Sequence, residues 1–347
     1  MATQQSIGLG QTPATLLCDT RAMNLLDQAN AVARELLATG APVFLPVNPV
    51  EYHGPHLSLH NDGLISAGFT KDLYAALAVE HPDWPLLEVS DLEVGVEAVQ
   101  GPGTRSIPYD TVLDLVLRAC ESLVRLGAKR VVLQTFHGSP LHDIALERGA
   151  RWLRAQGVPA VVPLNYLIHS FIEADASTYD VAYATIEDEA LRKQLQSDFL
   201  IDFHAGFMET SLTLHYAPDS VDPRRERLPK CPPFEPDARV MRASKAARAL
   251  GRKHLAAELG AAAYGLGWYA LRPFPGYSGH PALANARAGE AFANVFVEAL
   301  TPLVSRALDG RPPPLTAPAP WLHYATIRGR LGNVTTPLEQ VLTQFPA

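Results

Sequence analysis

Carboxylates and imidazoles that could bind a metal ion are concentrated in one short stretch of the sequence. Glu51 and His53 stand two positions apart, so in extended backbone both side chains point the same way and can approach one ion or two adjacent ions. Gly54 and Pro55 can turn the chain so that Asp62 returns to them. A carboxylate that bridges two cations holds them about 3.5 to 4 Å apart. The stretch therefore predicts a metal site built on Glu51, His53 and Asp62.

The alternative interpretation of this stretch is a polar loop without a ligand. The histidines would then cap turns, and Asp62 would cap a helix that begins near Ile65. Asp62 can cap a helix and bind metal at the same time. Capping alone leaves Glu51 and His53 without a role, so the metal site is the better interpretation of the whole group.

His137 and Ser139 form a second candidate cluster, directly after the apolar run Arg130–Phe136. A parallel sheet presents its ligands at the carboxyl ends of its strands, where His137 would project. A single histidine there is also typical of a hydrogen-bonded loop, and from this cluster alone both interpretations stay open. A serine nucleophile at Ser139 is disfavoured, because the Gly-x-Ser-x-Gly elbow is absent and no Asp and His follow in a convincing order.

A third cluster follows the apolar residues 199–201 and contains His204 and Glu209. Small residues beside His204 allow a substrate or another backbone to approach closely. Imidazole titrates near neutral pH, so His204 is a candidate general acid or base, and Glu209 could complete a metal shell. The alternative is a helix start with Glu209 in its first turn.

Alternating helices and strands must position these residues. The strands are too apolar to face water, which favours a parallel sheet covered by helices on both faces, an α/β fold of the doubly wound, mostly parallel type. Functional sites in such folds form at the carboxyl ends of the strands. The predicted strands are Pro42–Val47, Pro85–Val89, Arg130–Phe136 and Ala160–Pro163, and the predicted helices are Asn24–Ala38, Ile65–Val79, Thr111–Leu126 and His142–Gln156.

The second half of the chain departs from this rhythm. We expect a single domain over residues 1–310 with an insertion at about 165–200, followed by a Pro-rich linker and C-terminal tail over 311–347. The insertion contains a predicted helix at Thr185–Gln196, an irregular loop is predicted at Pro218–Pro236, a helix at Ala238–Leu259, and the extended linker at Pro312–Pro320.

Composition limits the class of protein and its partners. A formal net charge of -7 offers no basic stripe for nucleic acid or an anionic membrane, so we expect a small-molecule partner and copies of the chain itself. Three scattered cysteines argue against a disulfide framework and favour a reducing cytoplasm. The N-terminal residues show no export signal, and no apolar run approaches the length of a membrane span.

Taken in order, the motifs resemble those of the creatininase family, the creatinine amidohydrolases and their relatives. The resemblance runs from about residue 30 to residue 300. Its motifs are Leu45-Pro46-Val47 with Glu51-x-His53-Gly54-Pro55-His56-Leu57 and Asp62, then Pro102-Gly103-Thr104, His137-Gly138, His204-Ala205-Gly206-x-x-Glu209-Thr210-Ser211, and Gly276-x-x-Gly279-x-Pro281-x-Leu283-Ala284.

The resemblance implies a doubly wound α/β sheet, often assembled as a hexamer, and a binuclear metal centre that hydrolyses a non-peptide C–N bond. It implies that Glu51, Asp62 and His137 hold one ion, while His53, the bridging Asp62 and a glutamate hold the other. His204 would be the catalytic proton shuttle. Two divalent ions are expected, zinc before manganese or iron, because the ligands mix carboxylates with imidazoles.

The sequence departs from the family pattern at several positions. The second ion's usual glutamate is replaced by Ser139, so Glu209 is predicted as the substitute ligand. The changes fall mostly in the substrate pocket, for which Ser139, Phe207, Gly103 and Thr104 are the predicted residues. Without the family's pocket tryptophans before Trp268, creatinine itself is a doubtful substrate.

The expected reaction is hydrolysis of a cyclic or lactam-like amide in a small molecule by metal-activated water. Two alternatives stay open at this point. One is a formamide hydrolase or peptidase of the same family. The other is a catalytically silent, metal-binding scaffold, which the departures at Ser139, Phe207 and His280 motivate.

Overall fold

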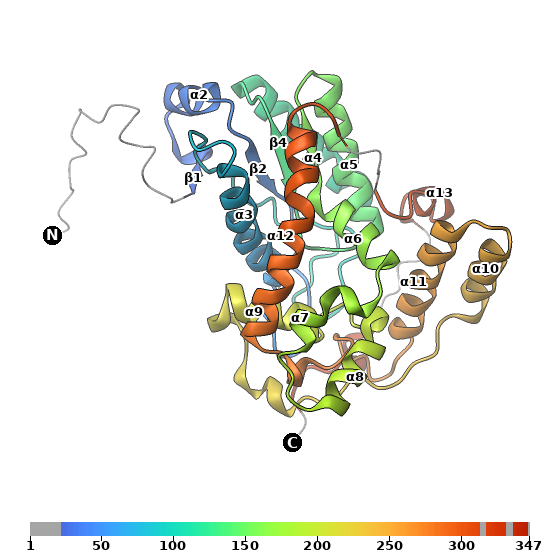
Figure 1. Ribbon diagram of the computed structural model, residues 1–347. Helices are drawn as coiled ribbons and strands as arrows, with labels where there is room; N and C mark the ends of the chain where they lie inside the picture. Colours follow the sequence, from blue (N-terminus) through green and yellow to red (C-terminus); the bar gives the residue numbers. More distant parts are fainter. Residues whose placement is uncertain (1–21, 313–316, 331–335, 346–347) are drawn as a thin grey trace.

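A five-stranded parallel sheet forms the centre of the computed structural model, which describes residues 22–312, 317–330 and 336–345 (Figure 1). The strand order is β1-β3-β2-β4-β5, and every pairing is parallel. The strands are β1 (Met23–Asn24), β2 (Val43–Pro46), β3 (Leu87–Glu88), β4 (Val131–Gln134) and β5 (Ala160–Val161).

Helices cover both faces of this sheet. One face is packed by α2 (Asn30–Ala38), α4 (Tyr109–Leu126) and α5 (Pro140–Ala155). The other is packed by α3 (Asn61–Ala78), α6 (Pro163–Glu173), α7 (Asp180–Tyr183), α9 (Phe207–Tyr216) and α12 (Ala286–Leu308). The predicted α/β fold with helices on both faces is confirmed.

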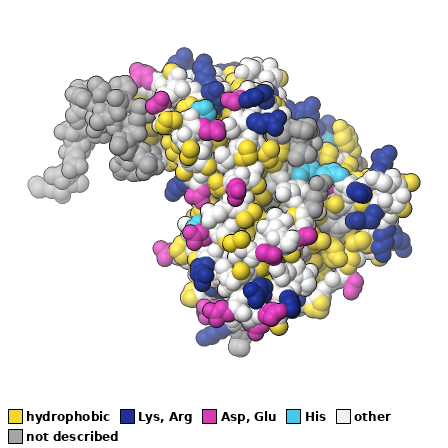
Figure 2. All heavy atoms as spheres, viewed as in Figure 1, with side chains coloured by type: hydrophobic (Ala, Val, Ile, Leu, Met, Phe, Trp, Pro, Cys, Tyr) yellow, Lys and Arg dark blue, Asp and Glu magenta, His cyan; other side chains and the backbone are white. Residues whose placement is uncertain are grey.

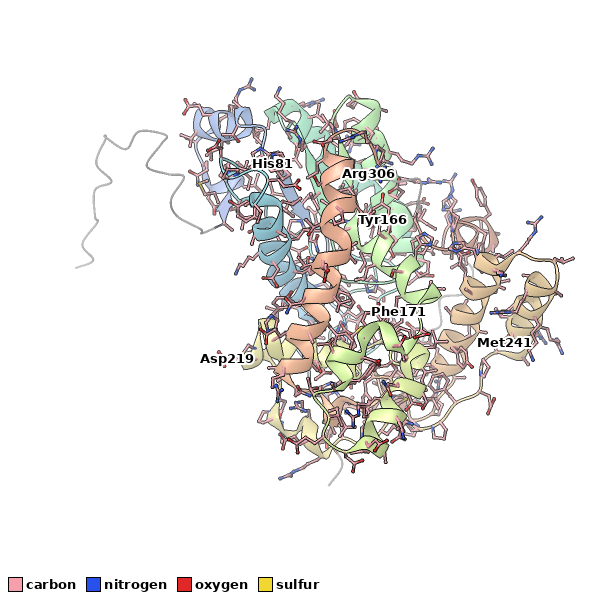
Figure 3. All side chains as sticks on the ribbon, in the orientation of Figure 1. His81, Tyr166, Phe171, Asp219, Met241 and Arg306 are labelled. Carbon is pink, nitrogen blue, oxygen red and sulfur yellow. The ribbon has the colours of Figure 1, made fainter. Side chains whose placement is uncertain are left out.

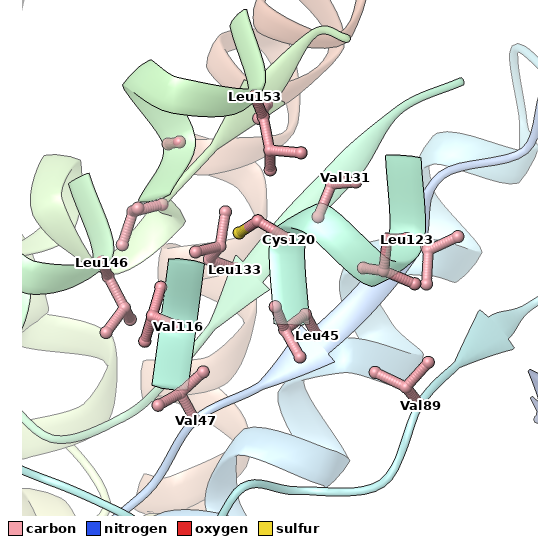
Figure 4. Packing of buried hydrophobic residues seen from close by; sticks show 14 of the residues in the cluster. Leu45, Val47, Val89, Val116, Cys120, Leu123, Val131, Leu133, Leu146 and Leu153 are labelled. Carbon is pink, nitrogen blue, oxygen red and sulfur yellow. The ribbon is translucent and has the colours of Figure 1, made fainter. Parts of the chain in front are cut away.

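Alternation along the two central strands explains why they are apolar throughout. Leu45 of β2 and Leu133 of β4 are paired in register and point to the α4–α5 face, where they meet Val116 and Cys120 of α4 (Figure 4). Phe44, one position earlier on β2, points to the opposite face. Both faces are buried, so neither strand can carry a polar face.

The winding of the chain changes direction around β2. From β2 the chain passes through α3 to β3 on one side, and from β3 through α4 to β4 on the other side. These two connecting helices lie on opposite faces of the sheet. In doubly wound folds ligands bind at the carboxyl ends of strands at this reversal, which here means beyond Pro46 of β2 and Gln134 of β4.

Several predicted elements differ from the structure in their bounds. The helix predicted from Asn24 starts only at Asn30, because Asn24 belongs to β1 and its side chain accepts a hydrogen bond from Leu26 N in a short 3-10 turn. The predicted strand Pro85–Val89 is reduced to its two central residues. The helix predicted over 238–259 is interrupted at Gly251, where φ is +74°, a conformation that breaks a helix.

The two helices on either side of Gly251 form a hairpin beside the main layers. They are α10 (Ala238–Ala249) and α11 (Lys253–Tyr269), which pack against each other, and α11 also contacts α6. Figure 3 labels Met241 on α10, at the outer edge of the molecule, and Tyr166 and Phe171 on α6, nearer the centre. Helix α6 therefore lies between the sheet and the hairpin.

Helix α12 is long and apolar enough to cross a membrane by length and composition alone. In the structure it runs across one face of the sheet, and its Phe292, Phe296 and Leu300 are buried in the core (Figure 1). Packing against α9, α3 and α7 accounts for its apolar residues in the way that a core helix requires.

The segments predicted as an insertion and a tail both contribute to packing. Residues 165–200 form α6, α7 and α8 (Glu189–Ser197), and Tyr179 and Tyr183 within them are buried in the core. Beyond residue 310, α13 (Leu322–Ala325) contacts α5, and Val341 forms a bridge with Phe274. Part of the predicted linker, residues 313–316, lies outside the described residues. The predicted domain boundaries themselves stay predictions.

Candidate metal centre

Four elements bring the predicted ligands together at the carboxyl ends of β2 and β4. Glu51 and His53 follow β2, and the N–H of Glu51 donates to Leu59 O at 2.9 Å, which closes the loop. Gly54 makes the predicted turn with a φ of +66°. The loop then enters α3, whose N-cap residue is His60, and Asp62 lies inside the first turn rather than at the cap position. Capping therefore does not explain Asp62.

The two oxygens of Asp62 face two different ligand groups. Its Oδ1 lies 3.3 Å from Nε2 of His53, which in turn lies 3.1 Å from Oε1 of Glu209. Its Oδ2 lies 3.7 Å from Nδ1 of His137, which in turn lies 2.9 Å from Oε2 of Glu51. All five side chains are buried, with exposures between 0% and 7%. The arrangement has two halves joined by one carboxylate.

Backbone carbonyls orient both imidazoles of the centre. Nδ1 of His53 donates to Glu51 O at 3.1 Å, and Nε2 of His137 donates to Val96 O at 2.8 Å, since a carbonyl can only accept. Each ring therefore directs its other nitrogen at the carboxylates. Metal-binding histidines are held in this way, because the second hydrogen bond fixes the tautomer and the ring orientation.

The donor atoms that converge here fit a cation better than they fit one another. Oε2 of Glu51, Nε2 of His53 and Oδ2 of Asp62 are buried and make no hydrogen bond of acceptable geometry to any described residue. Buried polar atoms without partners cost roughly 1 to 3 kcal/mol each. Carboxylate oxygens and imidazole nitrogens are ligands for zinc and manganese, so divalent cations would satisfy all three atoms.

Mutual electrostatics hold Glu51 and Glu209 ionised and His53 and His137 protonated. Burial favours the neutral forms, but the charge of His137 keeps the pKa of Glu51 well below its usual range. In turn Glu51 and Asp62 outweigh burial and raise the pKa of His137 to about 10. Asp62 and Glu209 likewise raise the pKa of His53, and His53 lowers that of Glu209. The protons on these two imidazoles therefore occupy nitrogen atoms that would bind cations.

His204 lies against the centre, outside the carboxylate group. Its ring stacks on His53 with 4.4 Å between centroids, and its Nε2 donates to Tyr52 O at 3.1 Å. Burial, and then the charge of His53, lower the pKa of His204, so the ring is neutral. Its Nδ1 is therefore an acceptor, as a proton shuttle needs. His204 also offers a ligand atom within 4.8 Å of ligand atoms of His53 and Glu209, so metal binding is its alternative role.

A tight turn before α9 positions His204 and Glu209 relative to each other. Asp202 accepts hydrogen bonds from the N–H groups of Phe207 and Met208 at the start of the helix, at 2.8 and 2.9 Å. Ala205 adopts the left-handed conformation with φ +48°, and its N–H donates to Oε2 of Glu209. Glu209 is in the first turn, so the helix-start interpretation and the ligand position hold together.

The residues predicted to bind substrate differ in the contacts that they make. Ser139 donates from Oγ to Oε2 of Glu97 at 2.6 Å. Thr104 instead ties loops together, donating from Oγ1 to Val99 O and accepting from Tyr52 N. Gly103 has a φ of +88° in the same turn, as a glycine turn requires.

Phe207 is the predicted pocket residue that the structure does not bring to the centre. Its ring is fully buried in the core, stacked on Tyr183 and in edge contact with Phe292. Its departure from the family pattern suggested a pocket role, but the first turn of α9 directs the side chain toward the helices that cover the sheet.

Several residues at the centre were not singled out from the sequence. Asn61 donates to Oε1 of Glu209 at 2.7 Å, and Trp268 lies against His204 with 5.3 Å between centroids. Glu97, with a φ of +58°, accepts from Ser139 and from the N–H of Leu141. Glu97 reaches these donors from a left-handed backbone conformation. No pattern in the sequence predicts that conformation.

Comparisons with known proteins identify the family of this chain. A family model described as creatininase, creatinine amidohydrolase, matches residues 28–304. Creatinine amidohydrolase from Pseudomonas putida is 27% identical over 194 residues, and the match covers 52% of this chain and 66% of that protein. The match thus spans slightly less than two thirds of that curated relative.

Solved structures with the same fold include several creatininases. One named for manganese superposes with a TM-score of 0.51 at 20% identity, and a mutant of a Zn-Zn type superposes with 0.52 at 21%. A mutant complexed with creatine gives 0.51 at 21%. Each covers 84% of this chain and 100% of the other. The family model spans most of the sequence, and this chain belongs to the creatininase family of amidohydrolases.

Proposed function

We propose that this protein is an amidohydrolase with two divalent metal ions that cleaves a non-peptide C–N bond, in a cyclic or lactam-like amide of a small molecule. The observation that carries the proposal is the position of Asp62, whose two oxygens face separate ligand pairs. A single ion would need only one of these pairs. Two ions sharing Asp62 use all five buried side chains.

Zinc is the ion we expect first, with manganese or iron as substitutes, because two imidazoles and three carboxylates suit all of them. Relatives with the same fold are named for manganese and for a Zn-Zn form, which supports both zinc and manganese as candidates. When bound, the ions supply Lewis-acid chemistry, lowering the pKa of water and polarising the amide carbonyl.

The chain itself contributes orientation and proton transfer. Glu51 and Glu209 are held at one oxygen by the backbone N–H groups of Val99 and Ala205, so the other oxygen is fixed toward the centre. Neutral His204 can take a proton at Nδ1 and pass it to the leaving nitrogen. Nearby, burial and the charges of Glu51 and Glu97 raise the pKa of Tyr269, which keeps its hydroxyl protonated as a donor.

The test combines metal analysis with a substrate screen. Purified protein is analysed by mass spectrometry for bound metals and then assayed against lactams, formamides and short peptides. We expect hydrolysis of a lactam-like substrate that a chelator abolishes and that zinc or manganese restores. Cleavage of formamides or peptides alone would replace the substrate class, and bound metal without any turnover would favour a silent scaffold.

The remaining expectations concern the setting of the protein. The two cysteines among the described residues, Cys120 and Cys231, are buried free thiols, which suits the reducing cytoplasm that we propose. We also propose a homo-oligomer, a hexamer by analogy with the family. Light scattering of the purified protein would decide the oligomeric state.

A further inference from the structure

We propose a second metal site, for one zinc-class transition ion, between helices α6 and α11. His169 of α6 and His254 and Glu258 of α11 each offer a ligand atom, and these atoms all lie within 4.8 Å of one another. The site shares no residue with the Asp62 centre, so it adds to the proposed function and does not depend on it.

The geometry of the three side chains is close to what a tetrahedral ion needs. The rings of His169 and His254 stack with 4.9 Å between centroids, and Nε2 of His254 lies 3.2 Å from Oε1 of Glu258. Ligand atoms about 2.0 to 2.2 Å from a tetrahedral zinc lie roughly 3.4 Å apart, so small side-chain rotations would complete the site. His254 and Glu258 are one helical turn apart, which places both on one face of α11.

Burial makes the site more than a surface ion pair. His169 is 6% exposed and Glu258 5% exposed, while the side chain of His254 is 44% exposed. Two ligands are thus held in place by packing, and the third lies where an ion and a water molecule can enter from solvent. Figure 2 shows histidine side chains gathered on this face, over the region where α6, α11 and α13 meet in Figure 1.

Glu258 also connects the site to the C-terminal segment. Its Oε1 accepts from the N–H of Ala319 at 2.7 Å, and its Oε2 accepts from Nε1 of Trp321 at 2.9 Å. A carboxylate has about four acceptor positions, so both bonds leave capacity for an ion. Such bonds orient a ligating carboxylate. One bound ion would therefore fasten α6, α11 and residues 319–321 together.

Helix α11, which carries two of the three ligands, also contacts His204 beside the Asp62 centre. The same helix ends in Trp268 and Tyr269, and Trp268 packs against His204. An ion at the other end of the helix would hold α11 against α6. Its primary effect is on stability, because the site shares no ligand with the Asp62 centre.

Metal counting in four proteins tests this site separately from the catalytic one. Each is saturated with Zn²⁺, dialysed and analysed: the unaltered chain, Asp62→Ala, His254→Ala and the double variant. If both sites exist, we expect about three, one, two and no ions per chain, respectively. The decisive comparison is Asp62→Ala with the double variant, because it does not depend on how many ions the catalytic centre holds. His81→Ala, which removes an imidazole elsewhere, should leave the count unchanged.

Thermal unfolding gives a second readout that is independent of dialysis. Zinc at about one hundred times its dissociation constant should raise the Tm of Asp62→Ala by roughly 5 °C and leave the double variant unmoved. Equal zinc content and equal Tm shifts in Asp62→Ala and the double variant would overturn the proposal. An unaltered chain that holds only the His254-dependent ion would overturn the proposed function and leave this second site standing.

Discussion

The Asp62 centre and the His169 cluster contain the same kinds of ligand but are built in different ways. The first places five buried side chains on loops and helix starts beyond the strands, with Asp62 shared between two halves. The second takes three side chains from the sides of two helices, and its carboxylate is already bonded to the C-terminal segment. Loops at a strand edge can face a substrate, whereas helix sides mainly fasten elements together. We therefore expect the first to control activity and the second to control stability.

The largest expected effect comes from removing the shared carboxylate. Asp62→Ala should abolish binding of both catalytic ions, because each half loses a ligand, and activity should fall by at least about a thousandfold. Metal content and kcat/KM measure the two effects. Asp72→Ala on the same helix, where the side chain only accepts from Tyr216, is the matched control. If the Asp62 variant kept both ions, Asp62 would not be their shared ligand. The proposed difference between the Asp62 centre and the His169 cluster would then fail.

Removing the proposed proton shuttle should separate catalysis from metal binding. His204→Ala is expected to lower kcat by about 10² to 10⁴ while both catalytic ions remain, since general acid–base catalysis contributes in that range. Activity and metal content are measured on the same preparation. Loss of an ion along with the activity would instead make His204 a ligand beside His53 and Glu209.

Substitution of Thr104 tests whether this residue contacts the substrate or supports the metal centre. Its hydroxyl joins Tyr52 to Val99, and the N–H of Val99 holds Glu51. Thr104→Val should weaken metal affinity about 10- to 100-fold, as loss of a supporting bond does. Thr301→Val on α12 removes a similar hydroxyl, one that donates to Val297 O within its own helix, and serves as the control. A rise in KM at unchanged metal affinity would restore the role predicted from the sequence.

The smallest expected effect is the release of protons when the catalytic ions bind. At pH 8 an ordinary imidazole has lost its proton, but the carboxylates raise the pKa of His137 to about 10 and that of His53 well above its usual value. Ions must displace these protons, so about two should be released per chain and affinity should increase as pH rises. Calorimetry in buffers of different ionisation enthalpy counts them. Release near zero at pH 8 would contradict this electrostatic account.

Much of the centre could be predicted because its ligands follow apolar strands in recognisable motifs. Glu51, His53 and His137 stand just after β2 and β4, and the carboxyl ends of parallel strands meet at one edge. The parts that could not be predicted depend on local backbone or on packing. The side chain of Phe207 turned into the core with the first turn of α9, and Glu97 reaches Ser139 only through a left-handed φ.

The cluster of His169, His254 and Glu258 shows more clearly what cannot be predicted from the sequence. His254 and Glu258 share an i,i+4 spacing, but His169 comes from a helix far earlier in the chain, and only the packing of α6 on α11 unites them. Trp268 reaches His204 for the same reason. Sequence patterns predict what a strand or helix presents, whereas contacts between distant helices require the folded structure.

Anomalous diffraction from crystals of the zinc- or manganese-loaded protein tests the central claim most directly. At the Asp62 centre, apart from any ion at His169, we predict two metal peaks about 3.5 to 4 Å apart on either side of Asp62. One lies beside Glu51 and His137 and the other beside His53 and Glu209. A single fully occupied peak, or two peaks that do not share Asp62, would contradict the account.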